Sequence, residues 1–489
     1  MGKRLAMTLA SLALVGGYAA ADIYDVAPGI LTRTTVTPLP APPASGGPSP
    51  TFVPLPTAGA ATVLSEPPPD APEPRAAKLA ERLKTALADP ALGPSVGVSV
   101  RDAVTGTELY ARDTATARVV ASTQKILTAA AVTQVLDPTQ VMTTKVVSPE
   151  PGELVLVAGG DTLLARGAGD PEVTAGHAGL GDLAAQVTAR IARSGARSWR
   201  LRLDNTYAAG PGYPDTPAYP TGWNPADVAA GYTQSVAMLG FADQRPKPGK
   251  PSPSDPAGAV LAAFADMVRA ALAKAGSEVE VTVSDTPKLR ATPVPAAAAE
   301  LGAVESAPYR DVLAEALDES DNALTENLAR QAAVQAGEDG SFSGNAAFVT
   351  AQLRTLGFDL TGTTLTDTSG LARGQHSTVA LLSAVTAKAV VGGLPGLDDA
   401  LGRLPVAGLD GTLYDRFRTE PASQAAGLAR AKTGTLTGIS GLLGTTVDAD
   451  DRQLIFVIVA DQVPPSMGTL AARAALDRFV AALTACGCG

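Results

Sequence analysis

Histidine is nearly absent from this sequence, which holds only His177 and His376 among its 489 residues. The two lie far apart without acidic neighbours at ligand spacing, so a histidine-rich metal site is excluded. A Ser-His-Asp triad is possible in principle but could use only one of these two histidines. Cysteine is equally rare, with Cys486 and Cys488 standing in the C-terminal Cys-Gly-Cys-Gly. One intervening residue is poor geometry for an unstrained disulfide, and we expect no structural disulfide framework.

Positive charge and aromatic side chains are also scarce. The net charge is −10, which argues against a nucleic acid as a partner. Aromatic residues make up 4% of the chain and hydrophobic residues 45%, so the cores must be built mainly from small aliphatic side chains. A length of 489 residues predicts two or three domains.

The N-terminal apolar run is short for a membrane span. It extends from Leu5 to Val15 and becomes a marginal span of about 20 residues only if it continues through Ala21. Basic residues precede it and a small-residue cleavage pattern follows it, as in a secretory signal. We therefore predict that residues 1–21 are a signal peptide or an uncleaved membrane anchor, and that the protein is exported. Residues 22–75 are rich in proline and are predicted to form an extended linker.

Ser122 lies where a helix is expected to begin. Residues 123–136 carry apolar side chains on one stripe, and serine is a favoured N-cap residue. A helix places residues three apart on one face, so Lys125 is expected beside the Ser122 hydroxyl. The N–H groups at a helix start also favour developing negative charge. A serine, an amine base and a positive dipole together predict an activated nucleophile, although Ser-x-x-Lys alone also fits an ordinary capped helix.

Two further motifs follow in order. Ser320-Asp321-Asn322 opens the helical pattern of Ala323–Gln335, and Asp321 is interpreted as a helix-start charge rather than a catalyst. Lys432-Thr433-Gly434-Thr435 leads into the alternating segment Gly438–Val447, which indicates a strand. Each motif is short, but three in this order, each on the element that its chemistry requires, indicate an active-serine enzyme.

The two ends of the chain are predicted to share one sheet. A helix at 76–89 and a hairpin at 96–112 begin this domain, and a strand at 453–460 and a helix at 470–483 complete it, with the first and last helices on one face. The first two motifs are 198 residues apart (320 − 122), enough for another domain. We expect one catalytic domain in two parts, 76–142 and 306–489, around an inserted α+β domain at 143–305.

Further segments carry a family resemblance over residues 76–484. They are Gly159-Gly160-Asp161, Trp223–Ala237, Asp367–Arg373, Leu404–Gly408 and Asp410–Leu413. With the three motifs, the chain resembles the low-molecular-mass penicillin-binding proteins of the D-alanyl-D-alanine carboxypeptidase/endopeptidase type that carry a large insert between the first two motifs. The resemblance implies an α+β fold: a serine β-lactamase/transpeptidase-like domain, in which an antiparallel sheet has helices on both sides, interrupted by the insert. Thr162, Thr368 and Ala372 depart from the usual residues, and we expect none of the three to affect the chemistry.

The resemblance also implies roles for the motif residues. Ser122 would attack the peptide bond between two D-alanines, after giving its proton to Lys125, whose pKa the second cation Lys432 should depress. Ser320 would relay a proton to the leaving amine, and Asn322 would orient Lys125 and the substrate. The expected substrate-binding residues are Thr433, Gly434, Thr435, Arg373 and Asp204. No cofactor or metal is expected.

The expected partners are peptidoglycan stem peptides and β-lactams. The expected location is outside the cytoplasm: the protein would be secreted, or anchored to the outer face of the plasma membrane, within the bacterial cell wall. A β-lactamase is the nearest alternative, but no glutamate stands at a plausible spacing to activate its deacylating water. A non-catalytic penicillin-binding sensor is another, and residues 1–75 show only an anchor and a spacer. The balance of carboxypeptidase and endopeptidase activity stays open at this point.

Overall fold

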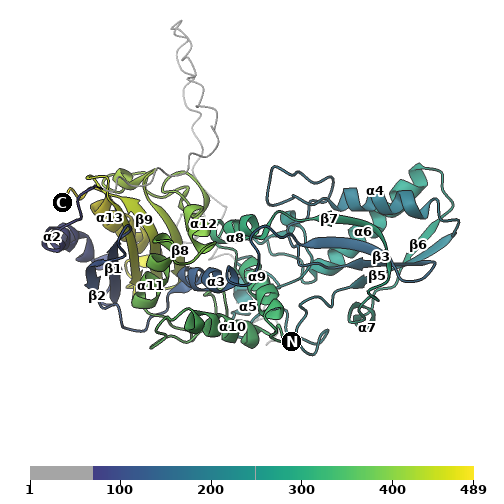
Figure 1. Ribbon diagram of the computed structural model, residues 1–489, viewed down its shortest axis with the longest axis horizontal. Coiled ribbons are helices and arrows are strands. Elements are labelled where there is room, and N and C mark those ends of the chain that lie inside the picture. Colours follow the sequence, from purple (N-terminus) through teal and green to yellow (C-terminus); the bar gives the residue numbers. More distant parts are fainter. Residues whose placement is uncertain (1–69, 248) are drawn as a thin grey trace, which may run out of the picture. The chain divides into compact units, whose positions relative to one another are not determined.

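Two five-stranded sheets organise the part of the chain that the computed structural model describes, residues 70–247 and 249–489 (Figure 1). The predicted N-terminal signal or anchor and all but the last residues of the linker lie outside this part. The first sheet is antiparallel and has the strand order β2-β1-β10-β9-β8. Its strands are β1 (Val96–Asp102), β2 (Glu108–Arg112), β8 (Arg430–Leu436), β9 (Ile439–Val447) and β10 (Gln453–Ala460).

The central strand β10 is buried on both faces because helices cover the sheet on both sides. Its alternate side chains enter two different cores, Phe456 and Ile458 on one face and Val457 and Val459 on the other. The first face carries α2 (Ala76–Leu87) and α13 (Gly468–Thr484), and the second carries α11 (Val379–Val390) and α3 (Lys125–Val132) (Figure 1). The predicted α+β fold, with helices on both sides of an antiparallel sheet, is confirmed.

Further helices complete this part of the molecule. They are α8 (Tyr309–Asp318), α9 (Asn322–Gln335), α10 (Phe342–Thr355) and α12 (Leu397–Gly402), with the 3₁₀ turns η1 (Pro90–Leu92), η2 (Ala121–Gln124), η4 (Gly411–Leu413) and η5 (Ala422–Ala425). The apolar sides of α3, α8, α9 and α10 meet in the core that also receives Val457 and Val459. This core anchors the starts of α3 and α9, the two elements that carry the first two motifs.

The second sheet is mixed and has the order β6-β5-β4-β3-β7. Its strands are β3 (Thr143–Ser148), β4 (Glu153–Val157), β5 (Ser198–Asp204), β6 (Glu280–Val283) and β7 (Ala299–Glu305). β4, β5 and β6 run parallel, whereas β3 pairs antiparallel with β4 and β7. The other elements of this region are α4 (Leu180–Ile191), α5 (Pro225–Ala229), α6 (Pro256–Lys274), α7 (Pro287–Arg290) and η3 (Ala242–Gln244).

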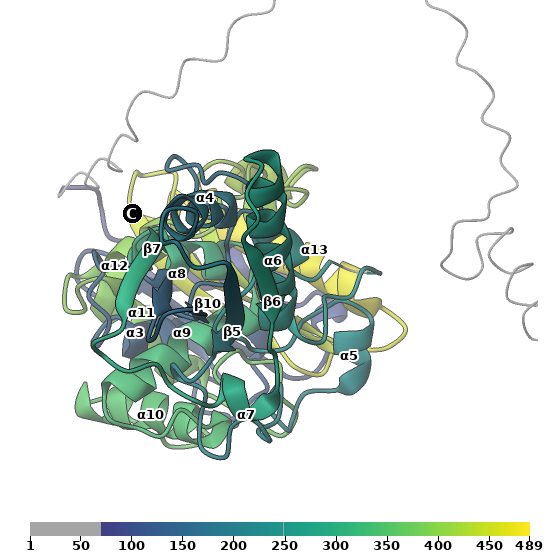
Figure 2. The same cartoon turned by 90° about the vertical axis from the view of Figure 1, so that its right-hand side faces the viewer.

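Helices α4 and α6 lie side by side over the second sheet (Figure 2). Within the described residues, α6 is the one helix that is long and apolar enough to cross a membrane. Its Val260, Phe264 and Val268 are buried in the core that also contains Leu201 of β5. The apolarity of α6 is therefore accounted for by packing inside this protein.

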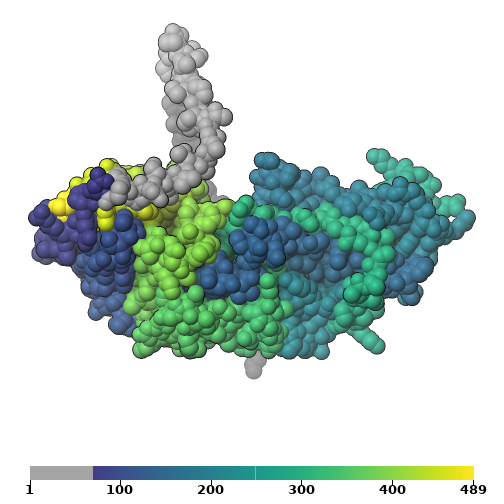
Figure 3. All heavy atoms as spheres, in the orientation of Figure 1, coloured from purple at the N-terminus to yellow at the C-terminus, as the bar shows by residue number. Residues whose placement is uncertain are grey.

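The chain leaves and re-enters the first part of the molecule at one place. The Met142 N–H donates to the Ser306 hydroxyl and the Ser306 N–H to the Met142 carbonyl, each over 2.9 Å. The core of the second sheet also includes Ala323 of α9 and Ala372. In the space-filling view the green surface of residues 306–360 adjoins the teal surface of residues 143–305 (Figure 3). The segment 143–305 thus has its own sheet and also packs on α9.

The C-terminal cysteines differ from the sequence-based expectation. Cys486 and Cys488 are joined in a disulfide, with Cα atoms 5.1 Å apart, inside the usual range for such bonds. Both side chains are buried in the core between α2 and α13. The Arg75 N–H donates to the Cys488 carbonyl over 2.8 Å, so the C-terminal tail holds the start of α2.

Candidate active site

Ser122 occupies the turn η2 rather than the N-cap of a helix. The predicted helix 123–136 is observed as α3, from Lys125 to Val132, and no side chain caps it. Ala121, just before the serine, has φ +49° and turns the chain sharply into η2. The prediction of an N-cap role was therefore wrong, because the Ser122 hydroxyl is turned towards Lys125 instead. The expectation that the Lys125 and Ser122 side chains lie next to each other is confirmed.

Lys125 is completely buried and makes three hydrogen bonds. Its Nζ lies 3.1 Å from the Ser122 Oγ, 2.6 Å from the Asn322 Oδ1 and 2.8 Å from the Ser369 carbonyl oxygen. Burial lowers the pKa of Lys125 to about 8, against the opposing effect of nearby carboxylates. A general base must be neutral to accept a proton, and a pKa of about 8 leaves about a tenth of Lys125 neutral at pH 7, far more than an ordinary lysine.

The third motif lies on β8, at the edge of the first sheet. Lys432 is fully buried, and its Nζ donates to the Thr433 carbonyl over 3.0 Å. Burial first, and then repulsion from Lys125, hold the pKa of Lys432 well below its usual value. For Lys125 itself burial is the main cause, so the expectation that Lys432 depresses the pKa of Lys125 assigned the wrong cause. The two buried amines nevertheless lie close enough for the charge of Lys125 to act on Lys432.

Gly434 lets β8 approach the serine turn. A Cβ atom at this position would lie 2.8 Å from the Val120 carbonyl oxygen and 3.0 Å from the Thr123 Cγ2. Both neighbours belong to the backbone or to a β-branched side chain and cannot move aside cheaply. Glycine here therefore lets β8 pack directly on the turn η2 that carries Ser122.

The second motif connects α8 to α9. Ser320 has φ +55° in the tight connection, and Asn322 begins α9 and reaches Lys125. The Asp321 carboxylate caps α9 by accepting the Leu324 N–H over 2.9 Å, and it forms an ion pair with Arg245 over 2.9 Å. The interpretation of Asp321 as a helix-start charge is confirmed.

A buried carboxylate network holds the Ser369 carbonyl against Lys125. Asp367 accepts hydrogen bonds from the Ser369 Oγ over 2.9 Å and from the Trp223 Nε1 over 2.8 Å. Glu326, on α9, accepts the Ser369 N–H over 3.0 Å. Burial, and then the nearby Asp367, raise the pKa of Glu326 to about 8. Trp223 comes from the segment 143–305, so this segment contributes to the network that supports Lys125.

One residue at the site was missed by the sequence analysis. Arg473, on α13, donates from its Nη2 to the Thr435 Oγ1 over 3.4 Å. Its Nε is buried without a hydrogen-bond partner, and burial followed by repulsion from Arg416 lowers its pKa. Nothing in the local sequence marked it, since it stands on an ordinary amphipathic helix 38 residues after Thr435 (473 − 435).

Two predicted substrate-binding residues are not brought to Ser122 by a described contact. Arg373 is exposed, and its backbone N–H donates to the Gly222 carbonyl over 3.2 Å. Asp204, at the end of β5, is buried. Its carboxylate accepts two bonds from Thr206 and, over 2.8 Å, one from the Val294 N–H. This arrangement fits a structural role within the second sheet.

Together, the fold and the Ser122–Lys125 pair define a serine peptidase of the penicillin-binding class. The profile of the D-Ala-D-Ala carboxypeptidase 3 (S13) family matches residues 79–245 and 246–483, and the chain belongs to this family. The resemblance inferred from the motifs is confirmed.

Individual relatives agree with the family assignment. The chain is 34% identical over 431 residues to a carboxypeptidase, DacB, of Mycolicibacterium smegmatis, covering 86% of each protein. It is 29% identical over 480 residues to a D-alanyl-D-alanine carboxypeptidase of Actinomadura sp., covering 83% of this chain and 85% of the relative. The crystal structure of penicillin binding protein 4 (dacB) from Haemophilus influenzae has the same fold, with a TM-score of 0.62 at 19% identity over 83% of this chain and 98% of that one.

Proposed function

We propose that this serine carboxypeptidase removes the terminal D-alanine from peptidoglycan stem peptides through an acyl-enzyme on Ser122. The observation that carries the proposal is the 3.1 Å contact between the Ser122 Oγ and a buried Lys125 whose pKa is lowered to about 8. An amine in this state accepts the hydroxyl proton as the oxygen attacks the peptide carbonyl.

The remaining motif residues have complementary roles in the proposal. The backbone N–H groups of Ser122 and Thr435 receive the negative charge that develops on the carbonyl oxygen. Ser320 passes a proton to the departing D-alanine amine, and Lys432 tunes this transfer by its charge. Asn322 orients Lys125, in keeping with their 2.6 Å contact. Water then hydrolyses the ester and restores Ser122.

The substrate's terminal carboxylate is recognised, in this proposal, by Thr433 and Thr435 with help from Arg473. A carboxylate needs hydrogen-bond donors and positive charge in a partly desolvated place. The buried Nε of Arg473 has no partner, and its Nη2 already touches Thr435. A peptide without a free carboxylate would leave this cation uncompensated, which favours exopeptidase over endopeptidase cleavage.

We place the reaction outside the cytoplasm, as peptidoglycan chemistry requires. The charged start, apolar run and small-residue pattern of residues 1–21 support export by a signal peptide or a membrane anchor. β-Lactams are proposed to acylate Ser122, since they present a strained amide to the same nucleophile and oxyanion site.

The test is the release of D-alanine from a pentapeptide stem, measured beside the hydrolysis of nitrocefin. The expected result is rapid D-alanine release together with a penicilloyl-enzyme that lasts for minutes. Many turnovers of nitrocefin per second without D-alanine release would instead establish a β-lactamase. Stable acylation with neither activity would establish a sensor.

A further inference from the structure

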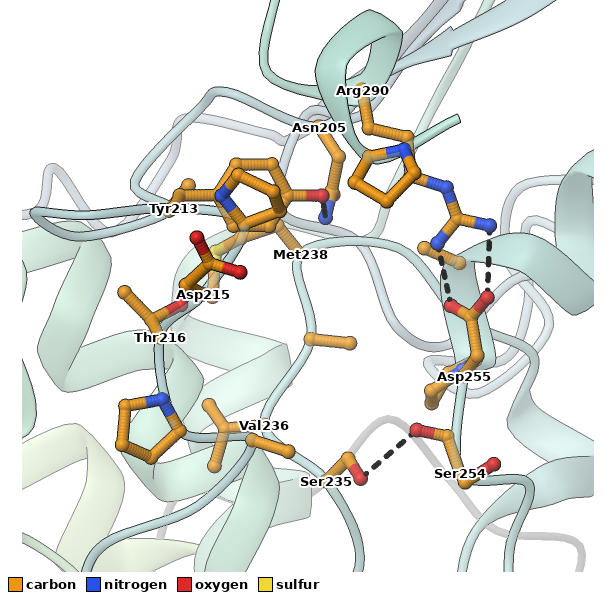
Figure 4. A pocket seen from close by; sticks show the side chains of 18 of the residues that line it. Asn205, Tyr213, Asp215, Thr216, Ser235, Val236, Met238, Ser254, Asp255 and Arg290 are labelled. Carbon is orange, nitrogen blue, oxygen red and sulfur yellow. Dashed lines mark hydrogen bonds and ion pairs between the residues drawn. The ribbon is translucent and has the colours of Figure 1, made fainter. Parts of the chain in front are cut away.

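A cavity of about 450 Å³ lies in the segment 143–305, where it meets α9 (Figure 4). Its walls come from the loop after β5, from residues 235–238, from the start of α6 and from the turn that precedes α7. One further lining residue, Arg330, belongs to α9. Arg330 is eight residues from Asn322 (330 − 322), or about 12 Å along the helix, so the cavity is separate from the catalytic serine.

Arg330 is a buried cation without a described counter-ion. Its side chain is 6% exposed, and its Nε is buried without a hydrogen-bond partner. No hydrogen bond or ion pair joins its guanidinium to another residue in 70–247 or 249–489. The guanidinium lies over the Phe342 ring, with 4.3 Å between Cζ and the ring centroid. The pKa of Arg330 is lowered to about 10 by burial, although Glu326, one turn earlier, acts in the opposite direction. A cation buried in this way destabilises the free protein unless an anion joins it.

The other charged groups of the cavity indicate which anion fits. Arg290 is already neutralised by two carboxylates. It makes an ion pair with Asp255 over 2.9 Å (Figure 4) and one with Asp285 over 2.5 Å. Asp215 lies across the cavity from Asp255 (Figure 4). The lining therefore holds three carboxylates against two guanidiniums, which disfavours a multiply charged phosphate. A single carboxylate at Arg330, on a ligand that also offers N–H donors to Asp215, matches this arrangement.

The uncharged part of the lining suits a peptide. The Tyr213 hydroxyl accepts a hydrogen bond from the Asn205 Nδ2 over 3.0 Å, and its own proton remains available for a ligand carbonyl. The Asn205 Oδ1 is buried without a partner and can accept a ligand N–H. Val236 and Met238 supply apolar surface to the same cavity (Figure 4). A volume of about 450 Å³ is within the range of small-ligand pockets.

We propose that this cavity is a second binding site, for a short peptide that ends in a free carboxylate, with Arg330 holding that carboxylate. The site binds without reacting, because no nucleophile–base pair lies among its lining residues. It does not depend on the function proposed for Ser122. For an enzyme acting on a polymer with many peptide branches, such a site would hold a peptide end next to the catalytic domain.

The proposal explains why an unfavourable residue stands at position 330. An apolar side chain of similar length would keep the contact with Phe342 and remove the buried charge. Arg330→Met is therefore expected to unfold at the same temperature as the wild type or higher, while losing the ligand. If Arg330 served the structure alone, Arg330→Met would instead unfold at a lower temperature and bind the ligand as tightly as the wild type does.

The test is isothermal titration of the full chain with diacetyl-L-lysyl-D-alanine, which ends in a carboxylate and lacks a D-Ala-D-Ala bond. Every protein compared, the wild type at position 330 included, carries Arg473→Gln, which weakens carboxylate binding beside Ser122. Arg330→Met and Arg330→Lys are compared with Arg354→Gln, which removes an exposed positive charge. We expect binding at the cavity to weaken at least tenfold in Arg330→Met, less in Arg330→Lys and not at all in Arg354→Gln. The C-terminal amide of the same peptide should bind as weakly to the wild type as the acid binds to Arg330→Met.

Equal affinity of the wild type and Arg330→Met for the acid would overturn the proposal, as would tighter binding of inorganic phosphate or of a chitooligosaccharide than of the peptide. Failure of the function proposed for Ser122 would look different. D-Alanine release would then be absent from the wild type, while Arg330-dependent binding of the dipeptide would persist.

Discussion

The lowered pKa of Lys125 makes a quantitative prediction for the pH dependence of acylation. With a pKa of about 8, the amine is about 1% neutral at pH 6, about 10% at pH 7 and about 90% at pH 9. The second-order rate constant for acylation by benzylpenicillin should therefore rise about tenfold between pH 6 and pH 7 and level off above pH 8. With an ordinary lysine pKa of 10.5 the rate would keep rising beyond pH 9. The difference between the two pKa values corresponds to about 3 kcal/mol in the free energy of deprotonating the amine.

Glu326→Gln provides the matched perturbation. At its pKa of about 8, Glu326 is largely protonated below pH 7, and glutamine resembles that neutral acid while keeping an oxygen to accept the Ser369 N–H. The acid limb of the acylation profile below pH 7 should therefore stay in place in Glu326→Gln, with the plateau rate retained. Stopped-flow acylation from pH 6 to pH 9 measures both quantities. An acid limb that moves by a pH unit or more in Glu326→Gln, or a wild-type midpoint above pH 10, would refute Lys125 as the base set by this environment.

Three other substitutions test neighbouring parts of the account. Gly434→Ala should slow acylation strongly and cost about 1–3 kcal/mol of stability, because its Cβ meets the Val120 carbonyl at 2.8 Å. Gly441→Ala on β9 should have only a small effect on both quantities. Equal acylation rates of the two variants would contradict the close approach of β8 to the serine turn. Trp223→Phe should slow acylation and lower stability by about 1–3 kcal/mol, because the hydrogen bond to Asp367 is lost. The Nε1 of Trp199 has no partner, so Trp199→Phe should change neither the acylation rate nor the stability, as measured by kinetic assays and thermal unfolding. Arg473→Gln should raise KM for peptides with a free terminal carboxylate and leave the C-terminal amide unaffected; a similar loss for both would mean that Arg473 acts only on structure.

The motif residues could be predicted because their geometry is set by local spacing. Ser122 and Lys125 are one turn apart in either a 3₁₀ or an α conformation, so the pairing survived the error about the N-cap. The cause of that error is remote in sequence. Ala121 turns with φ +49° where its carbonyl packs against Gly370, a glycine whose missing side chain leaves room for it.

Residues that act through tertiary contacts gave no such signal. Glu326 and Arg330 stand on α9 among other polar residues, and only the packing of that helix shows that both are buried. Arg473 reaches Thr435 from a helix on one face of the sheet. The strand order of the second sheet, with parallel neighbours β4, β5 and β6, depends on pairings between distant segments, which the apolar runs alone did not specify.

The division into a catalytic domain and an insert at 143–305 remains a proposal. The hydrogen bonds between Met142 and Ser306 support it, because they bring the two ends of the segment together. The bond from Trp223 to Asp367 shows in addition that the segment reaches the network behind Lys125. A variant that joins the two flanks directly is therefore expected to fold less stably than the full chain, and to acylate more slowly where it folds.

The most direct test of the central claim is the site of covalent attachment. The protein is incubated with benzylpenicillin, digested and sequenced by tandem mass spectrometry, beside a Ser122→Ala variant whose thermal unfolding matches the wild type. We predict one penicilloyl group per chain, on the peptide that contains Ser122, and none in the variant. An adduct on another serine, or labelling that persists in Ser122→Ala, would contradict the assignment of Ser122 as the nucleophile.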